Sequence, residues 1–306
     1  MRQGFCLIIL ITLLWSCTGP ESPSEINGNP MNRPEVQRVL FRPRVEARTA
    51  LPLGAADIDI EVEPGISIGC RLFTADKAAP TILFFHGNGE IVTDYDEIGP
   101  LYMQVGLNFL VVDYRGYGWS SGSPSYSTLL ADSRVLYAQL KQYLQENGYS
   151  PVLFLMGRSL GSACAIELAA AHNTEISGLI IESGFALTLP LAETLGLGEQ
   201  LKDVGMNEEQ TFNNAGKIST VTKPTFLLHG QRDTLIPLWQ AEKLHAECGA
   251  RSKELQVVPG ADHNSLIAVG GKYYFQAISR FVSQVTGADD WRRRRKQFKA
   301  AQAGQE

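Results

Sequence analysis

The segment that decides the fold is residues 152–161, which read VLFLMGRSLG. Residues 152–156 form a short apolar run of the kind found in strands buried on both faces. Gly157 and Gly161 then flank Ser159 in the pattern G-x-S-x-G, and a helical pattern follows. A strand-to-helix turn this sharp has no room for bulky neighbours, and it holds the serine hydroxyl out above the sheet. The motif alone is weak, but in this position it predicts a nucleophilic serine and not a simple turn residue.

Similar short runs recur on both sides of this segment and alternate with helical patterns. The further strands that we predict are Asp57–Val62, Ile66–Phe73, Thr81–Phe85, Phe109–Asp113, Gly178–Ile181, Thr225–Leu228 and Leu255–Val258. The turn Pro64-Gly65 joins the first two in an antiparallel hairpin, whereas the others read as central strands. A leucine stripe predicts a helix from Ser127 to the stop signal Asn147-Gly148, and the last helix should span Tyr273 to Val285. The fold class is therefore α/β, with a mostly parallel, eight-stranded sheet flanked by helices.

A serine hydroxyl needs a base to accept its proton. His263 follows the last predicted strand in the segment GADHN (260–264), from which it can reach back over the sheet edge. His86 and His229 each precede a glycine at a strand end and are interpreted as local structure. His172 and His245 fall in predicted helices. His263 is therefore the predicted base.

The base in turn needs an acid that fixes its tautomer and stabilises the imidazolium. Asp233 ends the segment HGQRD (229–233) just past a predicted strand. It completes the order Ser…Asp…His that accompanies a serine in a strand-to-helix turn of this kind, the nucleophile elbow. Glu182, at the end of the preceding strand, is the alternative acid. We favour Asp233 because its strand–His–Gly–x–x–Asp pattern is the more specific one. Asp262 is adjacent to His263 in sequence and is expected to point elsewhere.

Negative charge that develops on a substrate oxygen needs preorganised hydrogen-bond donors. The backbone N–H of Leu160, the residue after the predicted nucleophile, is one candidate. The second should come from the loop HGNG (86–89) after an earlier strand. In that loop the backbone N–H of Asn88 is the favoured donor, and that of Gly87 is the alternative.

Residues 113–125, DYRGYGWSSGSPS, resemble the D-Y-R-G-x-G-x-S-x-G-x-P-S loop of the α/β-hydrolase superfamily. With the segments FHGN (85–88), 157–161, 228–233 and 260–264, the resemblance covers roughly Ile58 to Val285. Within the superfamily, the chain is similar to the branch that contains serine-aminopeptidase-like, monoacylglycerol-lipase-like and depalmitoylase-like hydrolases. The resemblance implies the α/β-hydrolase fold and hydrolysis of acyl esters or thioesters through an acyl-enzyme, without a cofactor. It also implies that the 113–125 loop is mainly structural, so Asp113 and Arg115 are not predicted to be catalytic.

The composition is that of an ordinary globular protein, with 44% hydrophobic residues, 19% charged residues and a net charge of −5. No basic face dominates, which argues against a nucleic-acid partner, and no CxxC or His-rich cluster suggests a metal.

Three cysteines follow Cys17, and an odd number argues against a full disulfide framework. Cys164 is predicted to be a core thiol, whereas a bridge between Cys70 and Cys248 is left open.

The N-terminal residues 1–16 are predicted to be a signal peptide of the lipoprotein type. Arg2 supplies a positive charge, and Phe5–Trp15 is an apolar run too short to span a bilayer. The run ends in LWSC (14–17), which resembles a bacterial lipobox and makes Cys17 the predicted lipidation site, although Trp15 departs from the usual small or aliphatic residue. An ordinary cleaved signal peptide or an uncleaved anchor is the alternative. The expected location is the bacterial cell envelope, on the periplasmic or extracellular face.

The remaining boundaries follow from composition. Residues 17–50 contain a stretch rich in Ser, Asn, Glu and Pro and are predicted to be a tether. The hydrolase domain is expected over 51–286, with a small helical lid at about 187–220. Residues 287–306 form a basic tail that contains the run RRRRK (292–296), interpreted as a solvated tail or, alternatively, as a contact for anionic lipid.

The function predicted from these residues is that of a serine hydrolase. Its partners would be a small-molecule acyl ester or thioester and, through a lipid anchor, a membrane. A serine peptidase of the aminopeptidase type is one alternative, but no carboxylate for a substrate amine can be identified from the sequence. A non-catalytic binding module on the same fold is another, although such proteins usually lose a member of the triad and this chain keeps all three.

Overall fold

The computed structural model describes residues 28–202 and 205–288. Its centre is an eight-stranded sheet in the order β1-β2-β4-β3-β5-β6-β7-β8. The strands are β1 (Ala55–Glu63), β2 (Ile66–Phe73), β3 (Thr81–Phe85), β4 (Asn108–Val112), β5 (Leu153–Arg158), β6 (Gly178–Glu182), β7 (Thr225–Gly230) and β8 (Lys253–Val258). β1 pairs antiparallel with β2, and β2 pairs antiparallel with β4, whereas every other neighbouring pair is parallel.

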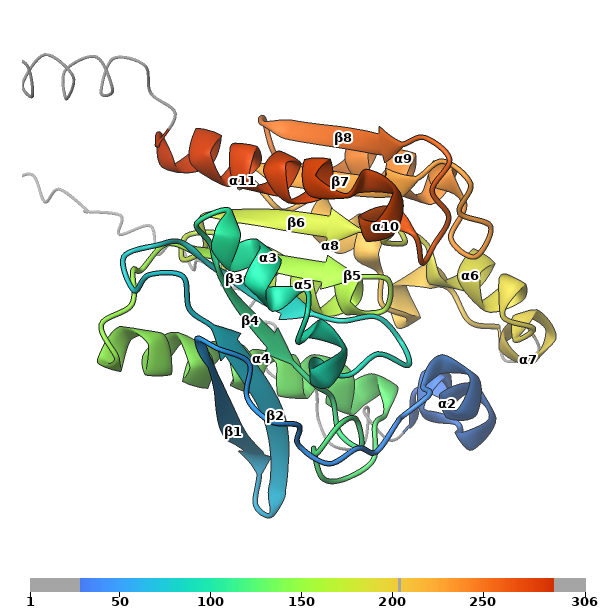
Figure 1. The fold of residues 1–306 in the computed structure, drawn as a ribbon. Coiled ribbons are helices and arrows are strands. Elements are labelled where there is room, and N and C mark those ends of the chain that lie inside the picture. The colour runs from blue at the N-terminus through green and yellow to red at the C-terminus, as the bar shows by residue number, and fades with distance from the viewer. Residues whose placement is uncertain (1–27, 203–204, 289–306) are drawn as a thin grey trace, which may run out of the picture.

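Helices cover both faces of this sheet (Figure 1). They are η1 (Pro30–Asn32), α2 (Pro34–Leu40), η2 (Val92–Tyr95), α3 (Gly99–Gln104), α4 (Tyr126–Glu146), α5 (Gly161–Ala171), α6 (Thr188–Thr194), α7 (Gly198–Lys202), η3 (Glu208–Gln210), α8 (Asn214–Ile218), α9 (Leu238–Glu247), α10 (Leu266–Gly270) and α11 (Lys272–Thr286). One core layer joins the sheet to α4 and α5, and the other joins it to α3 and α11. Because both faces are covered, the five residues of β3 and of β4 are all buried.

These elements confirm the predicted fold class and the alternation of strands and helices. The hairpin of β1 and β2 is present, and each later strand lies within about two residues of its predicted range. The long helix α4 starts where Ser125 accepts a hydrogen bond from the N–H of Thr128, and it ends at Asn147 as predicted. Its buried residues include Leu136 and Leu140 of the predicted stripe.

The structure differs from the prediction in the segment expected to be a tether. Residues 28–46 carry the helices η1 and α2, and the side chains of Met31, Val36 and Phe41 are buried in the core. Asn29 Nδ2 donates to the carbonyl of Gln210 over 2.9 Å, which connects this segment to the insertion between β6 and β7. The tether predicted over 17–50 therefore does not reach as far as 50. A few buried apolar residues anchor this segment, although most of the residues next to them in the sequence are polar.

The predicted lid occupies the connection between β6 and β7 and contains α6, α7, η3 and α8. Figure 1 shows α6 and α7 beyond the carboxyl ends of the parallel strands. Leu197 is buried, whereas Leu187, Leu189, Leu191 and Leu195 keep part of their surface exposed. Leu187, Leu189 and Leu191 pack against the core with the rest of their surface, so the four leucines are partly buried and retain some exposed apolar surface.

The cysteines of the described domain, Cys70, Cys164 and Cys248, are all free and buried. The bridge between Cys70 and Cys248 that the sequence left open is therefore not formed. Burial raises the pKa of the Cys164 thiol, as expected of a core thiol. Among the helices of residues 28–202 and 205–288, none combines the length and apolar character that a bilayer span requires.

Candidate active site

Ser159 lies in the sharp turn between β5 and α5, with a φ of +52°. This left-handed conformation is strained for a residue other than glycine and is often found at functional sites. The two flanking glycines are needed for space. A Cβ atom on Gly157 would overlap the carbonyl oxygen of Gly161, and a Cβ atom on Gly161 would overlap that of Phe85. The pattern G-x-S-x-G is thus a steric requirement of this turn.

Three of the predicted site residues lie in one hydrogen-bonded chain. His263 Nε2 lies 3.0 Å from Ser159 Oγ, and His263 Nδ1 lies 2.7 Å from Asp233 Oδ2. Both distances fall within hydrogen-bonding range. All three residues are nearly buried, which strengthens the interactions between them. The second oxygen of Asp233 accepts the N–H groups of Leu235 and Ile236, so the carboxylate is held in one orientation.

Glu182, the alternative acid, lies elsewhere. Its Oε1 accepts a hydrogen bond from Arg158 Nε over 3.2 Å, and its Oε2 accepts one from the Tyr274 hydroxyl over 2.6 Å. Burial raises the pKa of Tyr274, and the negative charge of the nearby Glu182 raises it further. The hydroxyl therefore stays protonated and donates. Between the two candidate acids, the geometry thus places Asp233 against His263. Asp262 points to Ser265 and the N–H of Asn264, away from the imidazole.

The two loops predicted to supply oxyanion donors lie at the same edge of the sheet, after β3 and after β5. Gly87 N–H donates to Glu90 Oε2 over 2.8 Å, so this alternative donor is already engaged. Asn88 is held by its side chain, which accepts hydrogen bonds from the Arg42 N–H and the Tyr117 hydroxyl. Within the described residues the backbone N–H groups of Asn88 and Leu160 make no hydrogen bond to protein.

The other histidines at strand ends have local partners. His86 lies between the carboxylate of Asp113 and the carbonyl of its neighbour Gly87. His229 donates from Nε2 to the carbonyl of Ile236 over 2.8 Å, while its Nδ1 atom is buried without a partner. Burial lowers the pKa of His229, which favours the neutral form of this imidazole next to Asp233.

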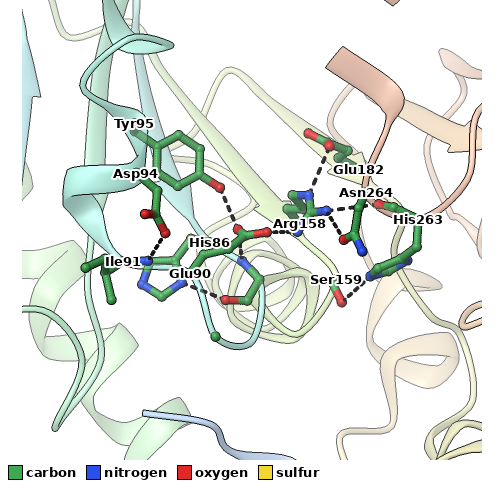
Figure 2. A network of polar contacts seen from close by, with 12 residues as sticks. His86, Glu90, Ile91, Asp94, Tyr95, Arg158, Ser159, Glu182, His263 and Asn264 are labelled. Atoms are coloured by element: carbon green, nitrogen blue, oxygen red, sulfur yellow. Dashed lines mark hydrogen bonds and ion pairs between the residues drawn. The ribbon is translucent and has the colours of Figure 1, made fainter. Parts of the chain in front are cut away.

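Arg158, the residue before Ser159, has a role that no sequence pattern indicated. Its guanidinium pairs with Glu90 and Glu182 and donates to the carbonyl of His263 over 2.9 Å and to Asn264 Oδ1 over 3.0 Å. Figure 2 shows this network directly beside Ser159 and His263. A variable position of G-x-S-x-G carries no signal by itself, and the partners come from the loops after β3 and β8 and from the last residue of β6. Only spatial proximity reveals the network.

A cavity of about 340 Å³ lies next to this network and is lined in part by Glu90, Arg158, Glu182, Asn264 and Tyr274. In the described residues no cluster of His, Cys, Asp and Glu has the geometry of a metal site.

Cys17, the predicted lipidation site, lies outside the described residues, as do the signal peptide and the basic run 292–296.

Fold and site together define a class of protein: an eight-stranded, mostly parallel sheet with a serine–histidine–aspartate chain at its carboxyl edge. The chain belongs to the α/β-hydrolase superfamily. It is 31% identical over 227 residues to human "Alpha/beta hydrolase domain-containing protein 17B", a match that covers 72% of each chain. It is 29% identical over 213 residues to "Protein bem46" of Schizosaccharomyces pombe, covering 68% of this chain and 69% of that one. The family model for "Serine aminopeptidase, S33" matches residues 76–198.

Solved structures show the same fold. The esterase Pf2001 of Pyrococcus furiosus superposes with a TM-score of 0.65 at 20% identity, covering 80% of this chain and 99% of that one. A soluble variant of monoglyceride lipase from Saccharomyces cerevisiae superposes with a TM-score of 0.63 at 18% identity, covering 78% and 96%. At these identities the two structures show the fold alone, and it is the membership of the α/β-hydrolase superfamily that supports a hydrolase.

Proposed function

We propose that this chain is a serine hydrolase that cleaves acyl esters or thioesters through an acyl-enzyme. The observation that carries the proposal is the continuous hydrogen-bonded chain Ser159–His263–Asp233 at the strained turn after β5. His263 takes the proton of Ser159 as Oγ attacks the acyl carbon, and it then donates that proton to the leaving alcohol or thiol. Asp233 orients the imidazole and stabilises its cationic form. Water activated by His263 then hydrolyses the acyl-enzyme and restores Ser159.

The tetrahedral intermediate carries a negative oxygen that must be stabilised. We assign this role to the backbone N–H groups of Leu160 and Asn88. The free N–H groups in the two loops support the assignment, as does the engagement of Gly87 with Glu90. The N-terminus of the eleven-residue helix α5 adds a favourable field at the same point.

An aminopeptidase is the second candidate, because the matching family model carries that description. Such an enzyme needs a carboxylate that can accept the amine of its substrate. Three carboxylates line the cavity beside the site, but Glu90 and Glu182 pair with Arg158, and Asp94 pairs with Arg44. Since these carboxylates already have cationic partners, hydrolysis of esters or thioesters is favoured over an aminopeptidase activity.

The location that we propose is the bacterial cell envelope, with Cys17 lipidated and the domain facing the periplasm or the outside. The short apolar run before Cys17 supports this proposal.

The proposed reaction is tested with a panel of esters, thioesters and aminoacyl amides, assayed with the purified protein beside a fluorophosphonate probe. Turnover of the esters or thioesters with labelling of Ser159 supports a serine hydrolase. Preferential cleavage of the aminoacyl amides supports a peptidase instead. Substrate binding without turnover or labelling would indicate the non-catalytic module.

A further inference from the structure

We propose that Arg158 is a positioning residue that fixes the loop of His263 relative to the loop of Asn88. The proposal rests on the proposed function, because it assigns these two loops to the base and to an oxyanion donor. Arg158 does not reach the reacting atoms by any hydrogen bond in the described structure. Its effect would pass through the groups that it holds.

The first connection leads to the loop of the base. Arg158 Nη2 donates to the carbonyl oxygen of His263 over 2.9 Å and to Asn264 Oδ1 over 3.0 Å. One nitrogen therefore holds two consecutive residues of the loop after β8. This contact fixes the backbone from which the imidazole projects toward Ser159.

The second connection leads to the oxyanion loop. Arg158 Nη1 pairs with Glu90 Oε1, while Glu90 Oε2 accepts the N–H of Gly87 and the hydroxyl of Tyr95. The carboxylate therefore carries the constraint from Arg158 to the backbone directly before Asn88. Gly87 makes the approach possible, because a Cβ atom there would lie only 2.6 Å from Arg158 Nη1.

The third contact anchors the guanidinium itself. Arg158 Nε donates to Glu182 Oε1 at the end of β6, a carboxylate whose other oxygen is held by Tyr274. The side chain of Arg158 is 11% exposed and that of Glu182 is 3% exposed, so the pair is well shielded from solvent. A planar fork with donors in fixed directions can hold three partners at once, which a lysine ammonium cannot reproduce.

The charge of Arg158 supports the same role. Glu90 and Glu182 flank it, and without the guanidinium both carboxylates would lose this cationic partner and keep only neutral hydrogen-bond donors, near the place where negative charge develops in the proposed reaction. Loss of Arg158 should thus loosen both loops and weaken stabilisation of the oxyanion. Both effects act on the chemical step more than on substrate binding.

The main test compares Arg158→Ala with Arg158→Lys, using p-nitrophenyl butyrate as substrate. We expect Arg158→Ala to lower kcat about 100-fold, while KM changes less than about threefold, as for misplaced catalytic groups. Arg158→Lys keeps the charge but loses the fork and should lower kcat about tenfold.

Low-millimolar guanidinium chloride should raise kcat of Arg158→Ala, because the adjacent cavity of about 340 Å³ can admit the ion. Sodium chloride at the same concentration should not.

Arg115→Ala is the matched control. Its guanidinium pairs with two carboxylates, those of Asp132 and Glu63, and its side chain is 12% exposed. Loss of these two ion pairs, of which the one to Asp132 is shielded from solvent, should lower the melting temperature much as Arg158→Ala does, yet leave kcat near that of the unmodified protein. Guanidinium should not increase the activity of this control.

Hydrogen–deuterium exchange gives a readout that does not depend on turnover. In Arg158→Ala, or in Arg158→Lys if the alanine variant does not fold, we expect faster exchange in both 86–90 and 262–266, and no such change in Arg115→Ala. Unchanged exchange in these two loops, or an unchanged kcat in folded Arg158→Ala, would overturn the positioning role. Absence of turnover and probe labelling in the unmodified protein would instead defeat the proposed function, and the exchange data would still decide the role of Arg158.

Discussion

The carboxylate of Asp233 lies 2.7 Å from Nδ1 of His263, although 30 positions separate the two residues in the chain. Each follows one of two neighbouring parallel strands, β7 and β8, whose last paired residues are Gly230 and Val258. Because parallel strands end at the same edge of a sheet, the two loops must leave it side by side. The close contact between acid and imidazole is therefore a consequence of the strand order.

The first prediction concerns Ser159. Ser159→Ala should abolish both fluorophosphonate labelling and ester turnover, because it removes the hydroxyl that lies 3.0 Å from His263 Nε2. Circular dichroism and the melting temperature should show that the fold is intact. A folded variant with turnover near that of the unmodified protein would show that Ser159 is not the nucleophile.

The second prediction separates the two candidate acids. Asp233→Asn should lower kcat by about 10⁴-fold, because an amide cannot support the tautomer and charge that the imidazole needs. Glu182→Gln should have the smaller effect, since Glu182 contacts Arg158 and Tyr274 and not His263. Steady-state kinetics of both variants decide between them, and a greater loss in Glu182→Gln would mean that the acid is misassigned.

The third prediction is a pH dependence of stability. Burial lowers the pKa of His229 from its usual value of about 6.5, so below that pH the unfolded chain binds more protons than the folded one. The contribution of His229 to stability is thus fully present above about pH 6.5 and is lost as the pH falls. In His229→Gln the melting temperature should decrease less steeply between pH 7.5 and 5.5.

His245→Gln, on the half-buried side of α9, serves as the control for this series and should retain the slope of the unmodified protein. If His229→Gln has that slope as well, the buried imidazole is not a source of acid sensitivity.

The fourth prediction concerns the acyl group. Leu187, Leu189, Leu191 and Leu195 keep part of their surface exposed between β6 and β7. Each substrate methylene that they bury would be worth about 0.8 kcal/mol. The small insertion leaves limited room, so kcat/KM over a p-nitrophenyl ester series should be highest for short-to-medium chains. Aminoacyl p-nitroanilides should be clearly poorer substrates. A flat chain-length profile would show that the leucines serve packing only.

The fifth prediction concerns location. Expressed in a bacterial host, the protein should be lipidated at Cys17 and should fractionate with membranes. Cys17→Ser should shift it to the soluble fraction or block its maturation. Mass spectrometry of the mature N-terminus provides the check. An unmodified terminus at another residue would contradict the prediction, with Trp15 as the apparent reason.

The sequence by itself determined the fold class, the approximate strand ranges and the candidates for nucleophile and base, and it narrowed the acid to two carboxylates. It could do so because these features are local. Burial on both faces imposes continuous apolar runs such as 81–85 and 152–156. A sharp turn imposes glycine at 157 and 161, where a side chain would overlap backbone atoms. Such constraints are visible within a few consecutive residues.

Only the tertiary structure decided between residues that are locally equivalent. Glu182 is the last residue of β6 and Asp233 follows the end of β7, but of the two only Asp233 contacts His263. Gly87 and Asn88 share a loop, but the N–H of Gly87 is engaged by Glu90. Arg158 occupies a position where the motif accepts any residue, and its partners lie 24 to 106 positions away. The physical reason is common to all three cases: a polar group's role depends on which other groups the packed chain brings within hydrogen-bonding distance, and no short stretch of sequence contains that information.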